Sequence, residues 1–150
     1  RYIIAVLKIN QDLERIGDLA VHIAERCLAL CENPVPPAAF RLGHMAEKTR
    51  TMLKRALDAF VELDAAQARA VCAADAEVDN LNQEIYLQVR HAVMKEPALF
   101  EPLLQVLAIG RLLERIADHA TNIAEDVIYL AEGRIVRHQQ EVSDKATPPA

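Results

Sequence analysis

The chain has 150 residues, of which 52% are hydrophobic and 26% charged, and its formal net charge is -5. This balance is typical of a globular domain with a real core and excludes disordered and collagen-like chains. The negative charge does not favour nonspecific nucleic-acid binding, in which Lys and Arg neutralise phosphates, so cations and basic protein surfaces are the expected partners. No apolar run approaches the roughly 20 residues needed to cross a bilayer, and we expect a cytoplasmic protein.

The first segment, RYIIAVLKI, opens with apolar residues and has no capping residue or turn before them. We therefore expect the chain to start inside a helix, with an upstream portion before it. Pro-containing breaks and Asp64 separate segments of helical periodicity, which lie near residues 2–32, 38–63, 65–95 and 98–132. Short connections between such segments make antiparallel neighbours, so the predicted fold is an all-α antiparallel helical bundle.

Apolar residues recur every three or four positions in these segments, as in the seam of a left-handed bundle. In the first segment they are Val6, Ile9, Leu13, Ile16, Ala20, Ile23, Cys27 and Leu30. The second segment has the looser set Leu42, Met45, Met52, Leu53, Leu57 and Phe60, and the third has Val71, Ala74, Val78, Leu81, Ile85 and Val89. In the fourth they are Val106, Ile109, Leu113, Ile116, Ala120, Ile123, Val127 and Leu130. Cys27 and Cys31, one turn apart, are interpreted as small core residues and not as a metal or disulfide site.

The first and fourth segments are copies of one another at an offset of one hundred residues. LERIGDLAVHIAER at 13–26 corresponds to LERIADHATNIAED at 113–126, and further identities extend the match in both directions. Such self-similarity indicates an internal repeat. We predict a repeating unit of three long helices, of which residues 1–33 contribute only the last helix of the first copy and residues 34–133 contribute the complete second copy. Residues 134–150 are predicted to be a frayed tail.

Acidic residues lie four positions apart beside these seams. The fourth segment has Glu114 and Asp118 followed by Asn122 and Asp126, the first has Glu14 and Asp18 followed by His22, and the third has Asp75 and Asp79. Like charges at this spacing destabilise a helix by roughly 0.2 to 0.5 kcal/mol per pair, so something should offset the repulsion. Either Arg15, Arg111 and Arg115 neutralise the acids on a solvated face, or carboxylates from neighbouring helices converge on a cation.

The sequence contains no candidate catalytic residues. No Glu is followed three positions later by His, as a ferritin-type di-iron site would need, and the nucleotide-binding and hydrolase motifs are absent. The scattered histidines His44, His91, His119 and His138 are expected to face solvent. A metal-storage or redox bundle remains the alternative from another functional class.

The paired runs at 13–26 and 113–126, the segment DAEVDNLNQEIYLQV between them and the KEP break together resemble the PhoU family. That family is built from two tandem three-helix bundles with Glu/Asp-x-x-x-Asp motifs. The motif is matched here by Glu14 with Asp18, Asp75 with Asp79 and Glu114 with Asp118. The resemblance extends to about residue 133.

The resemblance implies a cytoplasmic, non-enzymatic adaptor between a phosphate ABC transporter and a sensor histidine kinase, which represses phosphate uptake and starvation signalling. It also implies multinuclear iron or zinc at the acidic motifs of some members. From their places beside the acids, Asn122 and Asp126 are candidate secondary ligands. His22, which stands where the second copy has Asn122, is either a further ligand or a surface residue, and the surface interpretation is favoured. Because the chain lacks the first two helices of one repeat, a complete site is expected only in the second. The exposed seam of the first helix should pack on the remaining bundle or on another copy. The same motifs are also compatible with an alternative, in which the chain is a PhoU-like domain of a phosphate transporter.

Overall fold

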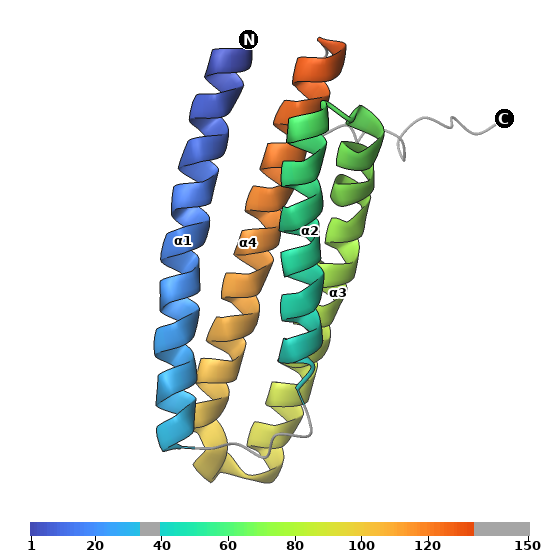
Figure 1. The fold of residues 1–150 in the computed structure, drawn as a ribbon. Helices are drawn as coiled ribbons and strands as arrows, with labels where there is room; N and C mark the ends of the chain where they lie inside the picture. Colours follow the sequence, from blue (N-terminus) through green and yellow to red (C-terminus); the bar gives the residue numbers. More distant parts are fainter. Residues whose placement is uncertain (34–39, 134–150) are drawn as a thin grey trace, which may run out of the picture.

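The computed structural model describes residues 1–33 and 40–133. Its helices run alternately up and down one bundle (Figure 1) and are α1 (Tyr2–Glu32), α2 (Leu42–Glu62), α3 (Ala65–Lys95) and α4 (Phe100–Glu132), with a 3-10 turn, η1 (Pro97–Leu99), before α4. The described residues include no strand, and the predicted all-α bundle is confirmed. The tail predicted for residues 134–150 lies outside the described residues.

The helix boundaries follow local chemistry. α1 and α3 match their predicted ranges, and the Asp64 side chain caps α3 by accepting hydrogen bonds from the backbone amides of Ala66 and Gln67. α2 begins at Leu42, later than the predicted residue 38. α4 begins two residues later than predicted because Pro97 opens the 3-10 turn, while Pro102 is tolerated in the first turn of α4, where a backbone amide has no helical acceptor.

α4 is the central helix of the bundle, and α1, α2 and α3 all pack against it. Its predicted seam is buried from Val106 to Val127, with Leu130 partly buried. The seam of α3 is likewise buried from Val71 to Val89, with Ala74 partly exposed. α2 contributes Met45, Met52 and two alanines to the same core. These helices form one continuous hydrophobic core.

The seam predicted for α1 is only partly right. Ile9 and Ile16 are buried as expected, but Val6, Leu13, Ala20 and Cys27 are exposed, and Ala5 and Leu19 are buried in their place. The reason is that α1 is an edge helix whose backbone approaches α4 alone (Figure 1). A helix with one neighbour buries only the narrow stripe that faces this neighbour and leaves the rest of its apolar face exposed.

Two partly buried polar pairs join α1 to α4. The Lys8 ammonium lies 3.1 Å from a carboxylate oxygen of buried Asp126. One turn further along α1, a carboxylate oxygen of Asp12 lies 2.7 Å from Nδ1 of His119, with both side chains largely buried. The prediction that His119 faces solvent is therefore wrong, because the opposing helix supplies a carboxylate that the sequence of α4 does not show. His44 and His91 are exposed as predicted, and His138 lies outside the described residues.

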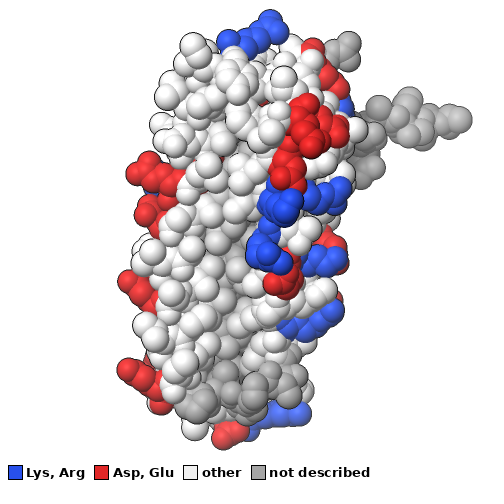
Figure 2. All heavy atoms as spheres, in the orientation of Figure 1, with Lys and Arg blue, Asp and Glu red and all other residues white. Residues whose placement is uncertain are grey.

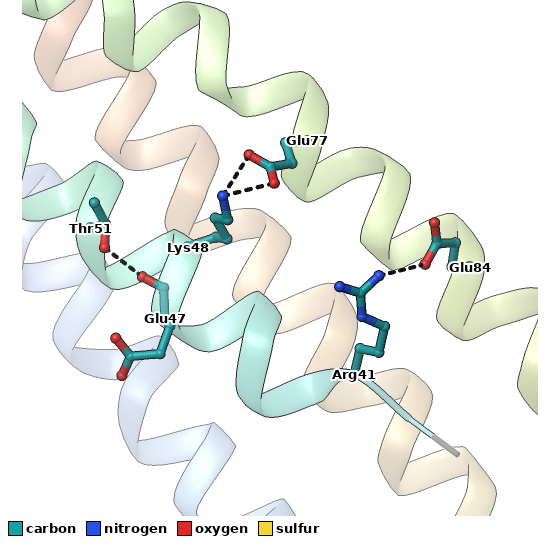
Figure 3. A network of polar contacts seen from close by, with 6 residues as sticks. All are labelled: Arg41, Glu47, Lys48, Thr51, Glu77 and Glu84. Atoms are coloured by element: carbon teal, nitrogen blue, oxygen red, sulfur yellow. Dashed lines mark hydrogen bonds and ion pairs between the residues drawn. The ribbon is translucent and has the colours of Figure 1, made fainter. Parts of the chain in front are cut away.

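Charged residues also connect α2 with α3 on the face shown in Figure 3. Lys48 forms an ion pair with Glu77 at 2.8 Å, and Arg41 approaches Glu84 to 3.7 Å. These pairs are solvent-exposed, so each contributes little to stability. They mark the side of α3 that faces α2, which leaves the opposite side of α3 for the acidic residues described below.

Cys27 and Cys31 are exposed on α1, so their assignment to the core is wrong. The cause is again the edge position of this helix. In the part of the chain that the structure describes, no helix has the length and apolar content needed to span a membrane.

Candidate functional site between α3 and α4

Four predicted acidic residues converge where α3 and α4 run side by side. Asp75 and Asp79 lie one turn apart on α3, and Glu114 and Asp118 lie one turn apart on α4. The charge of Asp79 raises the pKa of each of the other three carboxyls, and the charge of Asp118 raises the pKa of Asp75 and Glu114. We call these four residues the acidic cluster. They meet because the two helices are antiparallel and each places its acids on the same outward seam.

Desolvation is the largest cause of the raised pKa values in the acidic cluster, and mutual repulsion is the second. Together they raise the pKa of Asp75 to about 6. The pKa values of Glu114 and Asp118 are also raised, although Arg111 opposes the effect at Glu114. Within the described residues, none of the four carboxylates forms an ion pair with Lys or Arg. The alternative that arginines neutralise these acids through ion pairs is therefore not realised at the acidic cluster.

Polar neighbours complete the acidic cluster only in part. The amide nitrogen of Asn82 donates a hydrogen bond of 2.6 Å to Glu114. The hydroxyl of Thr121 is close enough to the Asp75 carboxyl to lower its pKa, but Oγ1 of Thr121 and Oδ1 of Asp75 are both buried and neither atom has a partner with full hydrogen-bond geometry. A buried carboxylate oxygen without a partner is energetically costly, and a cation would relieve this cost together with the repulsion.

The acidic pair of α1 has no such surroundings. Glu14 and Asp18 are exposed on α1, and so is His22 one turn beyond them. The described residues bring no second acidic pair to this face, because the backbone of α1 approaches only that of α4. The structure therefore keeps the two predicted sets apart.

The remaining predicted ligands lie away from the acidic cluster. Asn122 is exposed, and Asp126 is buried against α1, where it pairs with Lys8. Steps of four residues do not follow a helix face, because each advances by about 40° beyond a full turn. Between Glu114 and Asp126 the drift reaches about 120°, which turns Asp126 towards α1.

Sequence reasoning missed two neighbours of the cluster, Cys72 and Glu125. Burial, and after it the charges of Glu125 and Asp75, raise the pKa of the Cys72 thiol to about 11. A thiol with this pKa is a poor nucleophile at neutral pH. Both residues could have been found from their spacing. Steps of three and four place Cys72 on the same helix face as the acids up to Asn82, and Glu125 on the same face as those that begin at Glu114.

This chemistry fits cation binding better than proton transfer to a substrate. Carboxylates with an amide oxygen nearby are ligands for hard and borderline cations, and a neighbouring thiol widens the range to softer ones. In the part of the chain that the structure describes, no three His, Cys, Asp or Glu side chains are close enough to hold a metal as they stand. The donor set therefore fits a metal chemically, but its side chains would have to rotate to surround one.

Comparison with known proteins shows to which family the chain is similar. A family model described as the PhoU domain matches residues 1–27 and 42–127. The chain is 40% identical over 139 residues to a phosphate-specific transport system accessory protein PhoU homolog of Pseudomonas putida, covering 92% of this chain and 54% of that protein.

Two crystal structures share the fold. PhoU from Pseudomonas aeruginosa superposes with a TM-score of 0.84 and 38% identity, covering 88% of this chain and 64% of that one. The phosphate transport system regulatory protein PhoU from Streptococcus pneumoniae gives a TM-score of 0.76 and 32% identity, covering 89% of this chain and 63% of that one. The chain thus spans between about half and two-thirds of the length of these relatives. Because the family model includes α1 as well as the acidic motifs of α3 and α4, the chain belongs to the PhoU family.

Proposed function

We propose that this protein is a cytoplasmic accessory protein of a phosphate transport system. In this role it would act as an adaptor between a phosphate ABC transporter and a sensor histidine kinase and lower phosphate uptake and starvation signalling when phosphate is plentiful. The observation that carries the proposal is the 40% identity, over 92% of this chain, to a relative named as a phosphate-specific transport system accessory protein. An adaptor needs long binding faces and no reactive centre, which agrees with the exposed apolar and acidic faces of this bundle.

Phosphate uptake by cells tests the adaptor role. Cells lacking the protein are grown in excess phosphate, and uptake of radiolabelled phosphate and a phosphate-starvation reporter are measured. The proposal expects both to rise in the deletion strain and to return to normal when the gene is restored. Unchanged uptake and unchanged reporter activity in the deletion strain would contradict the role.

We further propose that the acidic cluster binds iron or zinc. The support is the unpaired, buried Oδ1 of Asp75, the raised pKa values of three carboxyls and the lack of ion pairs to them. A metal would be held by Asp75, Asp79, Glu114 and Asp118, whose repulsion it would offset. It would act as a structural or regulatory centre joining α3 to α4.

Metal content tests this site directly. The protein is purified without chelator and compared with the double variant Asp75→Asn plus Glu114→Gln. The matched control is Glu47→Gln plus Asp58→Asn, which removes the same charge from α2. Loss of metal is expected in the first variant alone, and full stoichiometry in that variant would rule out the acidic cluster as the site.

The domain organisation is also proposed. Val6, Leu13 and Cys27 of α1 are exposed, whereas the residues one hundred positions later, Val106, Leu113 and Val127, are buried by α2 and α3. α1 thus exposes the face that its copy buries, and Figure 2 shows a wide area without Lys, Arg, Asp or Glu between the acidic edge at α1 and the charged strip over α2. This supports α1 as the last helix of a separate repeat, whose other helices would cover that face.

Two cysteines provide a test of this organisation. Cys27 corresponds to buried Val127, whereas Cys31 corresponds to exposed Ala131. In the full-length protein we expect a thiol reagent to modify Cys31 quickly and Cys27 slowly, as read by mass spectrometry of peptides after timed labelling. Equal rates at both cysteines would show that nothing covers the seam of α1. A Cys27→Ser variant confirms which thiol accounts for each phase.

A further inference from the structure

An apolar groove lies on the outer face of α3 and α4, near the end of the bundle where the two helices are connected. We call it the α3–α4 groove; its volume is about 240 Å³, and its lining includes Tyr86 and Val93 of α3 and Phe100, Leu104 and Leu107 of α4. Tyr86, Phe100 and Leu104 are 56%, 47% and 39% exposed. Large side chains that remain exposed around one hollow are the usual mark of a binding surface.

The groove continues directly into the acidic cluster. On α3, Asp79, Asn82 and Tyr86 follow one another at spacings of three and four and therefore share a helix face. On α4, Leu107 and Glu114 share a face in the same way, about 10 Å apart along the axis. The seam between the two helices is therefore apolar in one half and acidic in the other.

This seam lies on the side of α3 away from α2. Glu77 and Glu84 reach towards the basic residues of α2 (Figure 3). Asp79 and Tyr86 each follow one of them by two residues, about 200° around the helix, and therefore lie on its opposite side. α1 covers a different side of α4, where it pairs with Asp126. The described helices therefore leave the outer seam open along its length.

Charge determines what kind of partner fits. Arg90 lines the groove, and the charges of Arg111 and Arg115 act on Glu114 and Asp118. No Lys or Arg of the described residues forms an ion pair with the acidic cluster, so its four carboxylates keep an excess of negative charge that attracts an external cation or basic side chain. An apolar groove between two parallel helix axes accepts side chains from successive turns of a third helix. We propose that the α3–α4 groove binds an amphipathic helix of a partner protein, with apolar side chains in the groove and basic side chains on the acidic cluster.

The proposal defines the pattern of the partner helix. Apolar residues are expected on successive turns, at spacings of three and four, to fill the groove. Lys or Arg should follow about two to three turns further on, because Leu107 and Glu114 are about 10 Å apart and Asp118 lies about one turn beyond. The orientation of the partner helix along the groove is thereby fixed, since only the end that carries its basic residues can contact the acidic cluster.

A designed peptide with this pattern is the probe. A fluorescent helical peptide carries leucines on successive turns and then arginines, and its binding to the full-length, chelator-treated protein is followed by fluorescence anisotropy. Leu104→Gln removes an apolar contact from the groove, and Asp79→Asn removes one negative charge. Leu87→Gln is the matched control, because Leu87 is 52% exposed on α3 but does not line the groove.

We expect each of Leu104→Gln and Asp79→Asn to weaken peptide binding about tenfold or more, with Leu87→Gln binding like the wild type. Asp79→Asn should also reduce the dependence of binding on salt. A peptide with glutamines in place of the arginines should bind the wild type more weakly than the arginine peptide does. It should bind the wild type and Asp79→Asn with equal affinity. Thermal unfolding followed by circular dichroism confirms that the variants fold.

Three outcomes would overturn the proposal. They are absence of binding to the wild type, equal binding to all variants, and a groove already occupied by a second copy, which light scattering would reveal as a dimer that Leu104→Gln dissociates. The proposal supplies a partner surface for the adaptor role and rests on it only in requiring a protein partner. Peptide binding is measured without transporter or kinase, so a peptide that does not bind contradicts the groove proposal and not the adaptor role. Unchanged phosphate uptake in the deletion strain contradicts the adaptor role and not peptide binding.

Discussion

Replacing Asp75 with Asn should stabilise the metal-free protein, even though the change removes a charged residue from a polar site. The carboxyl of Asp75 has an ordinary pKa of 3.8, which its surroundings in the folded protein raise to about 6. Between these values the folded state binds more protons than the unfolded state, so this residue lowers the free energy of unfolding as the pH rises through that window. Below the window both states are protonated and the penalty disappears.

The magnitude follows from the size of this pKa change. At about 1.4 kcal/mol per tenfold change in affinity for the proton, a fully buried carboxyl with this pKa would cost about 3 kcal/mol above pH 6. Asp75 is partly open to solvent, which screens the interaction, so we expect about 1 kcal/mol. Asp75→Asn, which is close to isosteric, should therefore raise the free energy of unfolding by about 1 kcal/mol near pH 7.5 and by little near pH 4.

Urea denaturation followed by circular dichroism, in chelator and at both pH values, measures this difference. The control is Glu77→Gln, because the ion pair with Lys48 lowers the pKa of Glu77, and its stabilising effect should be present at neutral pH and lost as the pH falls. The two variants should thus respond to pH in opposite directions. An Asp75→Asn variant that is less stable than the wild type near pH 7.5, or whose difference is the same at both pH values, would refute the assigned electrostatics.

Four further substitutions probe the helix boundaries and the packing. Gly17→Ala should stabilise α1 by about 1 kcal/mol through helix propensity, since no atom lies within 4 Å of the added methyl group. Gly110→Ala should gain less or lose stability, because its methyl group would lie 2.8 Å from the side-chain oxygen of Asn82; an equal gain in denaturant melts would contradict this contact. Asp64→Ala removes the cap of α3 and should cost about 1 kcal/mol, whereas an unchanged melting temperature would dismiss the cap. Ile123→Ala empties a fully buried position and should cost about 2 to 5 kcal/mol, with a cost below 1 kcal/mol arguing against the core position.

The heptad pattern predicts burial well for α3 and α4 and poorly for α1. Val106 and Val127 are buried because other helices flank α4 on several sides, whereas Val6 and Cys27 occupy the matching positions of α1 and are exposed. Periodicity identifies the apolar face of a helix, but the neighbour that covers this face is a tertiary property. The sequence of α1 therefore predicts a helix and its apolar face correctly, and its degree of burial incorrectly.

The candidate site shows the same division. The i, i+4 spacing places Glu114 and Asp118 on one face, and the convergence with Asp75 and Asp79 follows from antiparallel packing. The pairing of His119 with Asp12 could not be predicted, because it depends on the rotation and axial position of α1 against α4. Local spacing thus indicates which residues share a helix face, while contacts between helices require the structure.

The two partly buried polar pairs between α1 and α4 also determine how this contact can move. Lys8 and Asp12 lie one turn apart on α1, and their partners Asp126 and His119 lie about two turns apart on α4. Sliding α1 by one turn, about 5.4 Å, would separate both pairs and leave buried Asp126 without its cation. These pairs therefore oppose sliding of one helix along the other. A force that displaces α1 along its axis should displace α4 with it, so that the two helices move as one rigid body.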